Sequence, residues 1–118
     1  MLTFLDEDNN PHAIVPIYMD TVLIPVACII DTGFNGDILL TQKFSKYFTP
    51  IEDCFKTYQT ATGALQKHQL YTGTVGVDGI KRTSSFIFTK SSHNLIGIHF
   101  LQGYKLTLDL KNYTVDIT

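Results

Sequence analysis

The stretch Val26–Gly36, VACIIDTGFNG, joins the end of an apolar run to a polar loop that contains two glycines. The whole run Val22–Ile30 is apolar at odd and even positions alike, which predicts a strand buried on both faces. An aspartate directly after such a strand is costly unless it is hydrogen-bonded or leaves the core there. Backbone N–H groups of a glycine-rich loop bind carboxylates, so Asp31 is a candidate functional residue. The alternative is that Asp31 only ends the strand in a turn.

Short apolar segments separated by turn residues follow one another along the chain, which is typical of an all-β protein. Val15–Met19 and Ile38–Leu40 are predicted strands on either side of the central stretch. Thr41–Phe48 is the best candidate for a short helix, with Thr41 as its cap and Pro50 ending it. Ile98–Gln102 is expected to form one or two helical turns. About nine strands and so little helix predict a closed or nearly closed β-barrel.

The middle of the chain is predicted to be a long hairpin. Phe55–Thr60 forms one arm, Ala61-Thr62-Gly63 the tip, and Ala64–Val77 the return. The tip is small and polar, which suits a mobile loop. Tyr58 on the first arm is either a cleft residue or one that only packs.

The chain has 118 residues and a formal net charge of −2. This length fits one domain, residues 1–118, and leaves no room for a second. A charge near zero without a basic run argues against a nucleic-acid partner. The longest apolar stretch is half the roughly 20 residues that cross a bilayer, and the N-terminus lacks the pattern of a signal peptide, so we expect a cytoplasmic protein with no membrane partner. Cys28 and Cys54 are expected to be reduced.

Four motifs occur in a particular order along the chain. Asp31-Thr32-Gly33 is followed by the apolar segment Ile38–Leu40, by the hairpin tip, and by Asn94-Leu95-Ile96-Gly97 directly before Ile98–Leu101. Together they resemble the retropepsin-like aspartic proteases, the single-lobe relatives of pepsin. The resemblance covers residues 13–118. It is strongest to the small prokaryotic branch, in which Asp-Thr-Gly-Phe-x-Gly and a terminal Leu-x-Leu-Asp hairpin are familiar.

The resemblance implies an aspartic endopeptidase, built as a small closed β-barrel with a flap hairpin and one or two short helices. Because the chain holds a single Asp-Thr-Gly, it also implies a homodimer in which the Asp31 side chains of both subunits meet on a two-fold axis. The implied catalytic residues are Asp31, Thr32 and Gly33. The residues implied to hold a peptide or protein substrate are Phe34, Asn35, Ala61, Thr62 and Gly63. No metal and no cofactor is expected.

The sequence departs from retroviral members in two respects. Those members carry Ala or Ser after Asp-Thr-Gly, where this chain has Phe34. They also pair an aspartate with an arginine at the positions held here by Asn35 and Ile98. Both partners are absent together, so no buried charge is left unpaired, and the dimer must be secured differently. We expect edge strands at Met1–Leu5 and Val115–Thr118 to pair across the two-fold axis.

Other interpretations stay open. A noncatalytic module of the same fold would serve dimerisation or peptide binding, because a fold does not fix a function. An unrelated small β-barrel would bind a ligand. A calcium loop starting at Asp31 is disfavoured, because Gly33 occupies its third position and Gln42, not Glu, its twelfth.

Overall fold

The computed structural model describes residues 1–60 and 62–118. Over these residues the chain forms ten strands and one short 3₁₀ helix, η1. In chain order they are β1 (Leu2–Leu5), β2 (Pro11–Met19), β3 (Val22–Ile30), β4 (Ile38–Thr41), η1 (Gln42–Tyr47), β5 (Thr49–Gln59), β6 (Leu65–Val77), β7 (Ile80–Thr89), β8 (Leu95–Ile96), β9 (Leu106–Asp109) and β10 (Thr114–Ile117).

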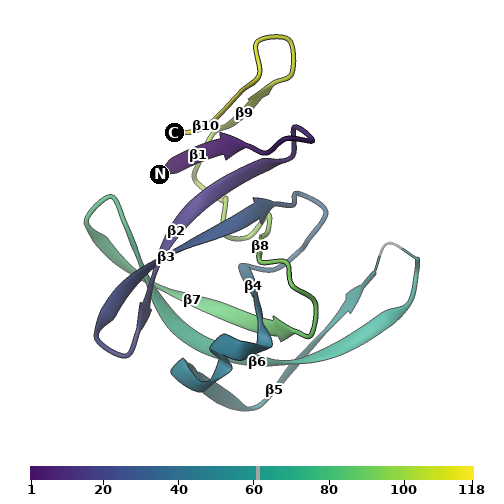
Figure 1. Ribbon diagram of the computed structural model, residues 1–118. Coiled ribbons are helices and arrows are strands. Elements are labelled where there is room, and N and C mark those ends of the chain that lie inside the picture. The colour runs from purple at the N-terminus through teal and green to yellow at the C-terminus, as the bar shows by residue number, and fades with distance from the viewer. Residues whose placement is uncertain (61) are drawn as a thin grey trace.

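The main sheet closes on itself. Its strand order is β1-β2-β3-β8-β4-β7-β6-β5, and a further pairing of β2 with β6, at Ile17 and Val75, joins the two sides into a ring. β1 and β5 lie outside this ring as flanking strands, and β9 and β10 form a separate hairpin. Figure 1 shows the β5–β6 hairpin reaching away from the ring, while both termini lie beside each other at the β9–β10 end. The predicted all-β barrel with a long hairpin is therefore confirmed.

The core fills the inside of this ring. In β2 every second residue is buried, so that one face of the strand is apolar and inward. β3 behaves in the same way over its second half, where Val26, Cys28 and Ile30 are buried. The prediction that β3 is buried on both faces was wrong, because Val22 and Leu23 are exposed. A barrel wall has one inner face, and the start of β3 belongs to a hairpin with β2 that leaves Val22 and Leu23 largely exposed.

The helix predictions need correction. The segment expected to be helical at residues 41–48 is the 3₁₀ helix η1, and the Thr41 side chain makes no capping hydrogen bond to it. The helix ends at Tyr47, before Pro50, and that proline pairs with Tyr71 in the β5–β6 ladder. Residues 98–102 form successive turns and not a helix. Glycine follows at once in a left-handed conformation, φ +87° at Gly103, which stops a regular helix from extending.

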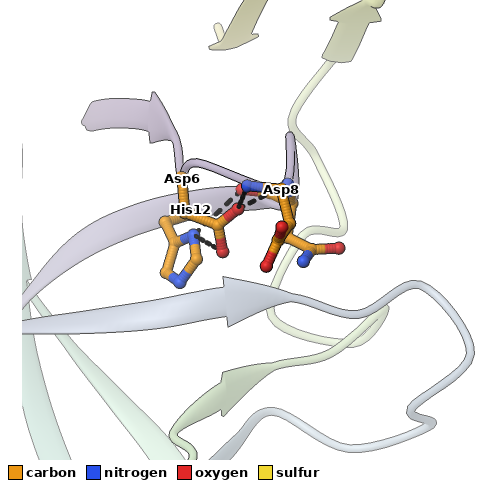
Figure 2. Close-up of polar contacts among 4 residues, drawn as sticks. Asp6, Asp8 and His12 are labelled. Carbon is orange, nitrogen blue, oxygen red and sulfur yellow. Dashed lines mark hydrogen bonds and ion pairs between the residues drawn. The ribbon is translucent and has the colours of Figure 1, made fainter.

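A compact turn ties β1 to β2, as Figure 2 shows. The Oδ1 atom of Asp6 accepts hydrogen bonds of 2.9 Å from the backbone N–H groups of Asp8 and Asn10. The bond from the Asn10 backbone is the main reason that the pKa of the Asp6 carboxyl lies below its ordinary value. His12 places Nδ1 3.0 Å from the Asn10 carbonyl and stacks on the Phe4 ring, with centroids 4.7 Å apart. This turn sets up the antiparallel pairing of β1 with β2, in which Leu2 lies opposite Ile14 and Leu5 opposite Pro11.

No helix in the described parts of the chain is long and apolar enough to cross a membrane. Both cysteines are free thiols, as predicted. Cys28 is buried in the core, where loss of hydration raises its pKa to about 12, and Cys54 is half-buried on β5.

Candidate active site

The Asp31 loop, residues 31–37, joins β3 to β4, and the short strand β8 lies between these two strands in the sheet. β8 pairs with β3 in parallel, with Ile30 opposite Ile96, and with β4 in the antiparallel sense, with Ile38 opposite Ile96. Ile30, Ile38 and Ile96 are all buried, so three inward-facing isoleucines anchor the three strand ends. This arrangement brings the residues that follow Asp31 next to those that follow Ile96, far away in the sequence.

Asp31 leaves the core at the end of β3 but stays held by the backbone. Its N–H donates to the Ile96 carbonyl at 2.9 Å, and its own carbonyl accepts from Phe34 N–H at 3.1 Å. The Gly33 N–H donates to Oδ1 of the Asp31 carboxylate at 3.0 Å. Asp31 is half-buried, whereas Thr32 and Gly33 are exposed. The loop therefore presents one fixed carboxylate at a surface, with its second oxygen left for another partner.

Gly97 locks this loop against the segment after β8. A Cβ atom on Gly97 would lie 2.3 Å from the Gly36 carbonyl oxygen and 2.5 Å from the Phe34 carbonyl oxygen, so only glycine fits. Because the loop and this segment lie so close together, the N–H groups of Gly97 and Ile98 reach carbonyl oxygens of the loop. Gly97 N–H donates to the Asp37 carbonyl and Ile98 N–H to the Phe34 carbonyl, both at 2.9 Å.

The predicted substrate-binding residues fall into two places. Phe34 is buried, with 9% of its surface exposed, and its ring packs over Gly36 and against Tyr58. Asn35 is exposed, and its carbonyl accepts a 3.4 Å bond from Lys56 Nζ on β5. Both are therefore in the Asp31 loop and touch the first arm of the β5–β6 hairpin.

The other predicted substrate-binding residues are at the hairpin tip. Thr62 and Gly63 are exposed there, and Gly63 adopts φ +86°, which favours glycine. Ala61, the third residue of the predicted tip, lies outside the described residues. The turn is closed by bonds from Thr60 N–H to the Ala64 carbonyl and from Gly63 N–H to the Thr60 carbonyl. The contacts between hairpin and loop come from the arm, through Lys56 and Tyr58.

Two polar residues that support the site were missed at the sequence level. Oδ2 of Asp37 accepts bonds from the N–H and the hydroxyl of Ser85 on β7, at 3.0 and 3.2 Å. Arg82 donates to the Phe100 carbonyl at 3.0 Å and lies 4.5 Å from the centre of that ring. It thereby anchors the turns after Gly97. Nothing local in the sequence marks either pair, because their partners are 48 and 18 residues away.

A separate groove of about 450 Å³ lies beside η1 and β6. Its walls are mostly polar, and the Asp31 loop does not contribute to them; they come from Gln42, Ser45, Gln66, His68, Gln69, Tyr71, Phe88, Thr89 and Lys90. Across residues 1–60 and 62–118, no group of three or more histidine, cysteine, aspartate or glutamate side chains is placed to hold a metal ion.

Comparison with solved structures identifies the architecture. The chain is similar to the foamy viral protease-reverse transcriptase in complex with an RNA/DNA hybrid, with TM-score 0.56 and 18% identity, over 83% of this chain and 13% of that one. It is similar to the same viral protein's dRH form in complex with double-stranded DNA, with TM-score 0.55 and 19% identity, over 83% of this chain and 16% of that one. The fold is retropepsin-like. No family model and no curated protein matches the sequence.

The retropepsin-like fold accounts for the order of the motifs along this chain. β3, β4 and β8 meet at the Asp31 loop. The long β5–β6 hairpin follows β4 and precedes β7 along the chain. The chain spans less than a fifth of the viral proteins that it matches, so the likeness concerns the fold alone. The closer resemblance to a prokaryotic branch stays a prediction.

Proposed function

We propose that this protein is an aspartic endopeptidase that works as a homodimer. The observation that carries the proposal is the Asp31 carboxylate. It stands half-exposed at the end of a buried strand, one oxygen takes the Gly33 N–H, and the whole loop is fixed by β8 and Gly97. A preorganised carboxylate on a rigid barrel is what proton transfer to and from water requires.

The chemistry needs a second carboxylate. Two carboxyl groups about 3 Å apart share one proton, because like charges so close do not both ionise. One Asp31 takes a proton from the water that attacks the peptide carbonyl, and its partner's carboxyl donates a proton towards the developing oxyanion. One chain has a single Asp-Thr-Gly, so the proposal requires a two-fold dimer.

The neighbouring residues have roles in the same scheme. Thr32 is exposed next to Asp31, where its hydroxyl would bond across the two-fold axis. The Gly33 carbonyl and the backbone of the hairpin tip would hold a peptide substrate as an added strand, with Thr62 and Gly63 above it. Asn35, exposed on the loop, would contact the substrate beside them.

The experiment is a peptide-library digest with wild type, Asp31→Asn and Asp20→Asn at several pH values. Asp20→Asn is the matched control, because Asp20-Thr21 resembles the motif but lacks the glycine and is exposed. We expect Asp31→Asn to abolish cleavage without unfolding the protein, since the side chain keeps its size and loses both acid and base roles. Activity should be highest at acidic pH, where the pair carries one negative charge. Equal cleavage by wild type and Asp31→Asn would refute the proposal.

Sedimentation tests the assembly on which the mechanism depends. A dimer at micromolar concentration is expected for wild type and for Asp31→Asn. A well-formed dimer that cleaves nothing at any pH would favour the noncatalytic binding module over the enzyme. A protein that stays monomeric at high concentration, with and without peptide, would remove the catalytic interpretation.

A further inference from the structure

Phe34 of the Asp31 loop and Tyr58 of the first hairpin arm, β5, pack on each other. The Phe34 and Tyr58 rings lie with centroids 5.3 Å apart and tilted by 52°, within the range of favourable aromatic pairs. Gly36 makes room for them. A Cβ atom there would lie 2.5 Å from Cζ of Phe34 and 3.1 Å from the Tyr58 hydroxyl. The contact therefore depends on a glycine of the Asp31 loop as well as on the two rings.

Further contacts hold the same arm on the same loop. Lys56, two residues before Tyr58 on β5, donates to the Asn35 carbonyl and places Nζ 5.3 Å from the Tyr58 ring centre. On its other side Tyr58 meets the edge of His68 from β6, with centroids 5.9 Å apart. Both arms of the hairpin thus reach the loop through one tyrosine.

Tyr58 is partly buried, and Asp37 is the charged group that most affects its hydroxyl. Burial, and then the negative charge of Asp37, raise the pKa of its hydroxyl above the ordinary value. Asp37 is itself held by Ser85 on β7, so the loop side of the contact is fastened to the barrel wall. On the hairpin side, β6 pairs with β7 of the barrel wall only from Tyr71 onward. The arms before that point are joined by the β5–β6 ladder, whose register is irregular between Pro50 and Phe55.

We infer that the Phe34–Tyr58 contact is a latch that couples the position of the β5–β6 hairpin to the conformation of the Asp31 loop. Tyr58 is then a positioning residue, and Phe34 acts by packing and not as a wall of the substrate cleft. Phe34 lies directly after Gly33, whose N–H bonds to the Asp31 carboxylate, and its own N–H bonds to the Asp31 carbonyl. Movement of the hairpin arm therefore reaches the carboxylate through two residues. The effect on catalysis rests on the proposed function, whereas the mechanical coupling does not.

Amide hydrogen exchange measures the coupling without any need for enzymatic activity. The full-length protein is compared as wild type, Tyr58→Ala, Tyr58→Phe, Phe34→Leu and the Phe34→Leu/Tyr58→Ala double variant. Phe55→Ala is the matched control, because Phe55 is an aromatic residue of the same arm that is half-exposed and lies under Lys67. Peptide fragments that cover residues 31–37 report on the loop, and fragments that cover β5 and β6 report on the hairpin.

We expect Tyr58→Ala to speed exchange about threefold to tenfold in the hairpin arms and also in the Asp31 loop, the factor that loss of one aromatic pair predicts. Tyr58→Phe keeps the ring and should behave like wild type. Each single variant already removes the Phe34–Tyr58 contact. The double variant should therefore exchange no faster than the faster of the two single variants. Phe55→Ala should leave the loop unchanged.

Two results would overturn the latch. Loop exchange that stays at the wild-type rate in Tyr58→Ala would show that the arm and the loop move independently. Equal acceleration by Tyr58→Phe and Tyr58→Ala would show that the ring contact is not the coupling element. If wild type cleaves peptides, Tyr58→Ala should also lower kcat/KM while Phe55→Ala does not. A wild type that cleaves nothing would defeat the proposed function and leave the exchange test intact.

Discussion

Replacing Gly97 with alanine tests the packing on which the candidate site depends. The added Cβ would lie 2.3 Å from the Gly36 carbonyl oxygen and 2.5 Å from the Phe34 carbonyl oxygen. Both are backbone atoms, so no side chain can rotate away to make room. The Asp31 loop and the segment after β8 must separate, and the 2.9 Å bonds from Gly97 N–H to Asp37 and from Ile98 N–H to Phe34 must lengthen or break.

The expected cost follows from these contacts. Overpacking in a close-packed region costs about 1–3 kcal/mol. A buried backbone group that loses its hydrogen bond costs about 1–3 kcal/mol more. We therefore expect Gly97→Ala to lower the free energy of unfolding by about 2–6 kcal/mol, a large part of the roughly 5–15 kcal/mol of a typical domain. At about 4 °C per kcal/mol for a chain of this size, Tm should fall by about 8–24 °C.

Urea unfolding of wild type, Gly97→Ala and Gly76→Ala measures this cost. Gly76 is the matched control, because it lies in β6 and the atoms nearest to a Cβ there would be side-chain atoms of Leu23 and Tyr18, at 3.2 Å or more. Its substitution should change stability by less than about 1 kcal/mol, helped by the lower entropy of the unfolded chain. A loss below about 1 kcal/mol for Gly97→Ala would refute the close approach of the loop and the segment after β8.

Further outcomes are expected from the same structure. Phe86→Ala should cost about 3–5 kcal/mol in urea unfolding, because this fully buried ring packs on Phe48 with centroids 4.5 Å apart. A thiol reagent should label Cys54 in the folded protein but Cys28 only after unfolding, since Cys28 is buried with its pKa raised to about 12. Burial and the charge of Asp37 raise the pKa of Tyr58 above that of the unfolded chain, about 10. The folded state therefore holds this proton more tightly, so stability should fall as the pH rises above about 10, and less so in Tyr58→Phe.

The strand pattern was readable from the sequence because alternation and turn residues are local signals. β2 and β7 appear where apolar alternation places them, and β4 coincides with the apolar segment Ile38–Leu40. The second hairpin arm matches β6, whereas the first, β5, begins at Thr49, earlier than the predicted Phe55. Local signals failed where the environment decides. Val22 and Leu23 look like core residues, but the end of their hairpin is left uncovered. In residues 98–102 the expected helical turns are limited to the bonds from Leu101 N–H to the Gly97 carbonyl and from Gln102 N–H to the His99 carbonyl. No regular helix follows, because the chain turns there to meet Arg82 and the Asp31 loop.

The candidates for chemistry can be identified from local sequence. An apolar strand that ends in Asp31-Thr32-Gly33 identifies the carboxylate and the glycine beside it, because a charged group at a strand end needs backbone donors close by in the chain. The residues that support that carboxylate are brought to it by the folding of distant segments. β8, Gly97, Asp37 with Ser85, and Tyr58 reach the Asp31 loop from elements distant in sequence. Contacts of this kind depend on how the ring of strands closes, and no periodicity within one segment encodes them.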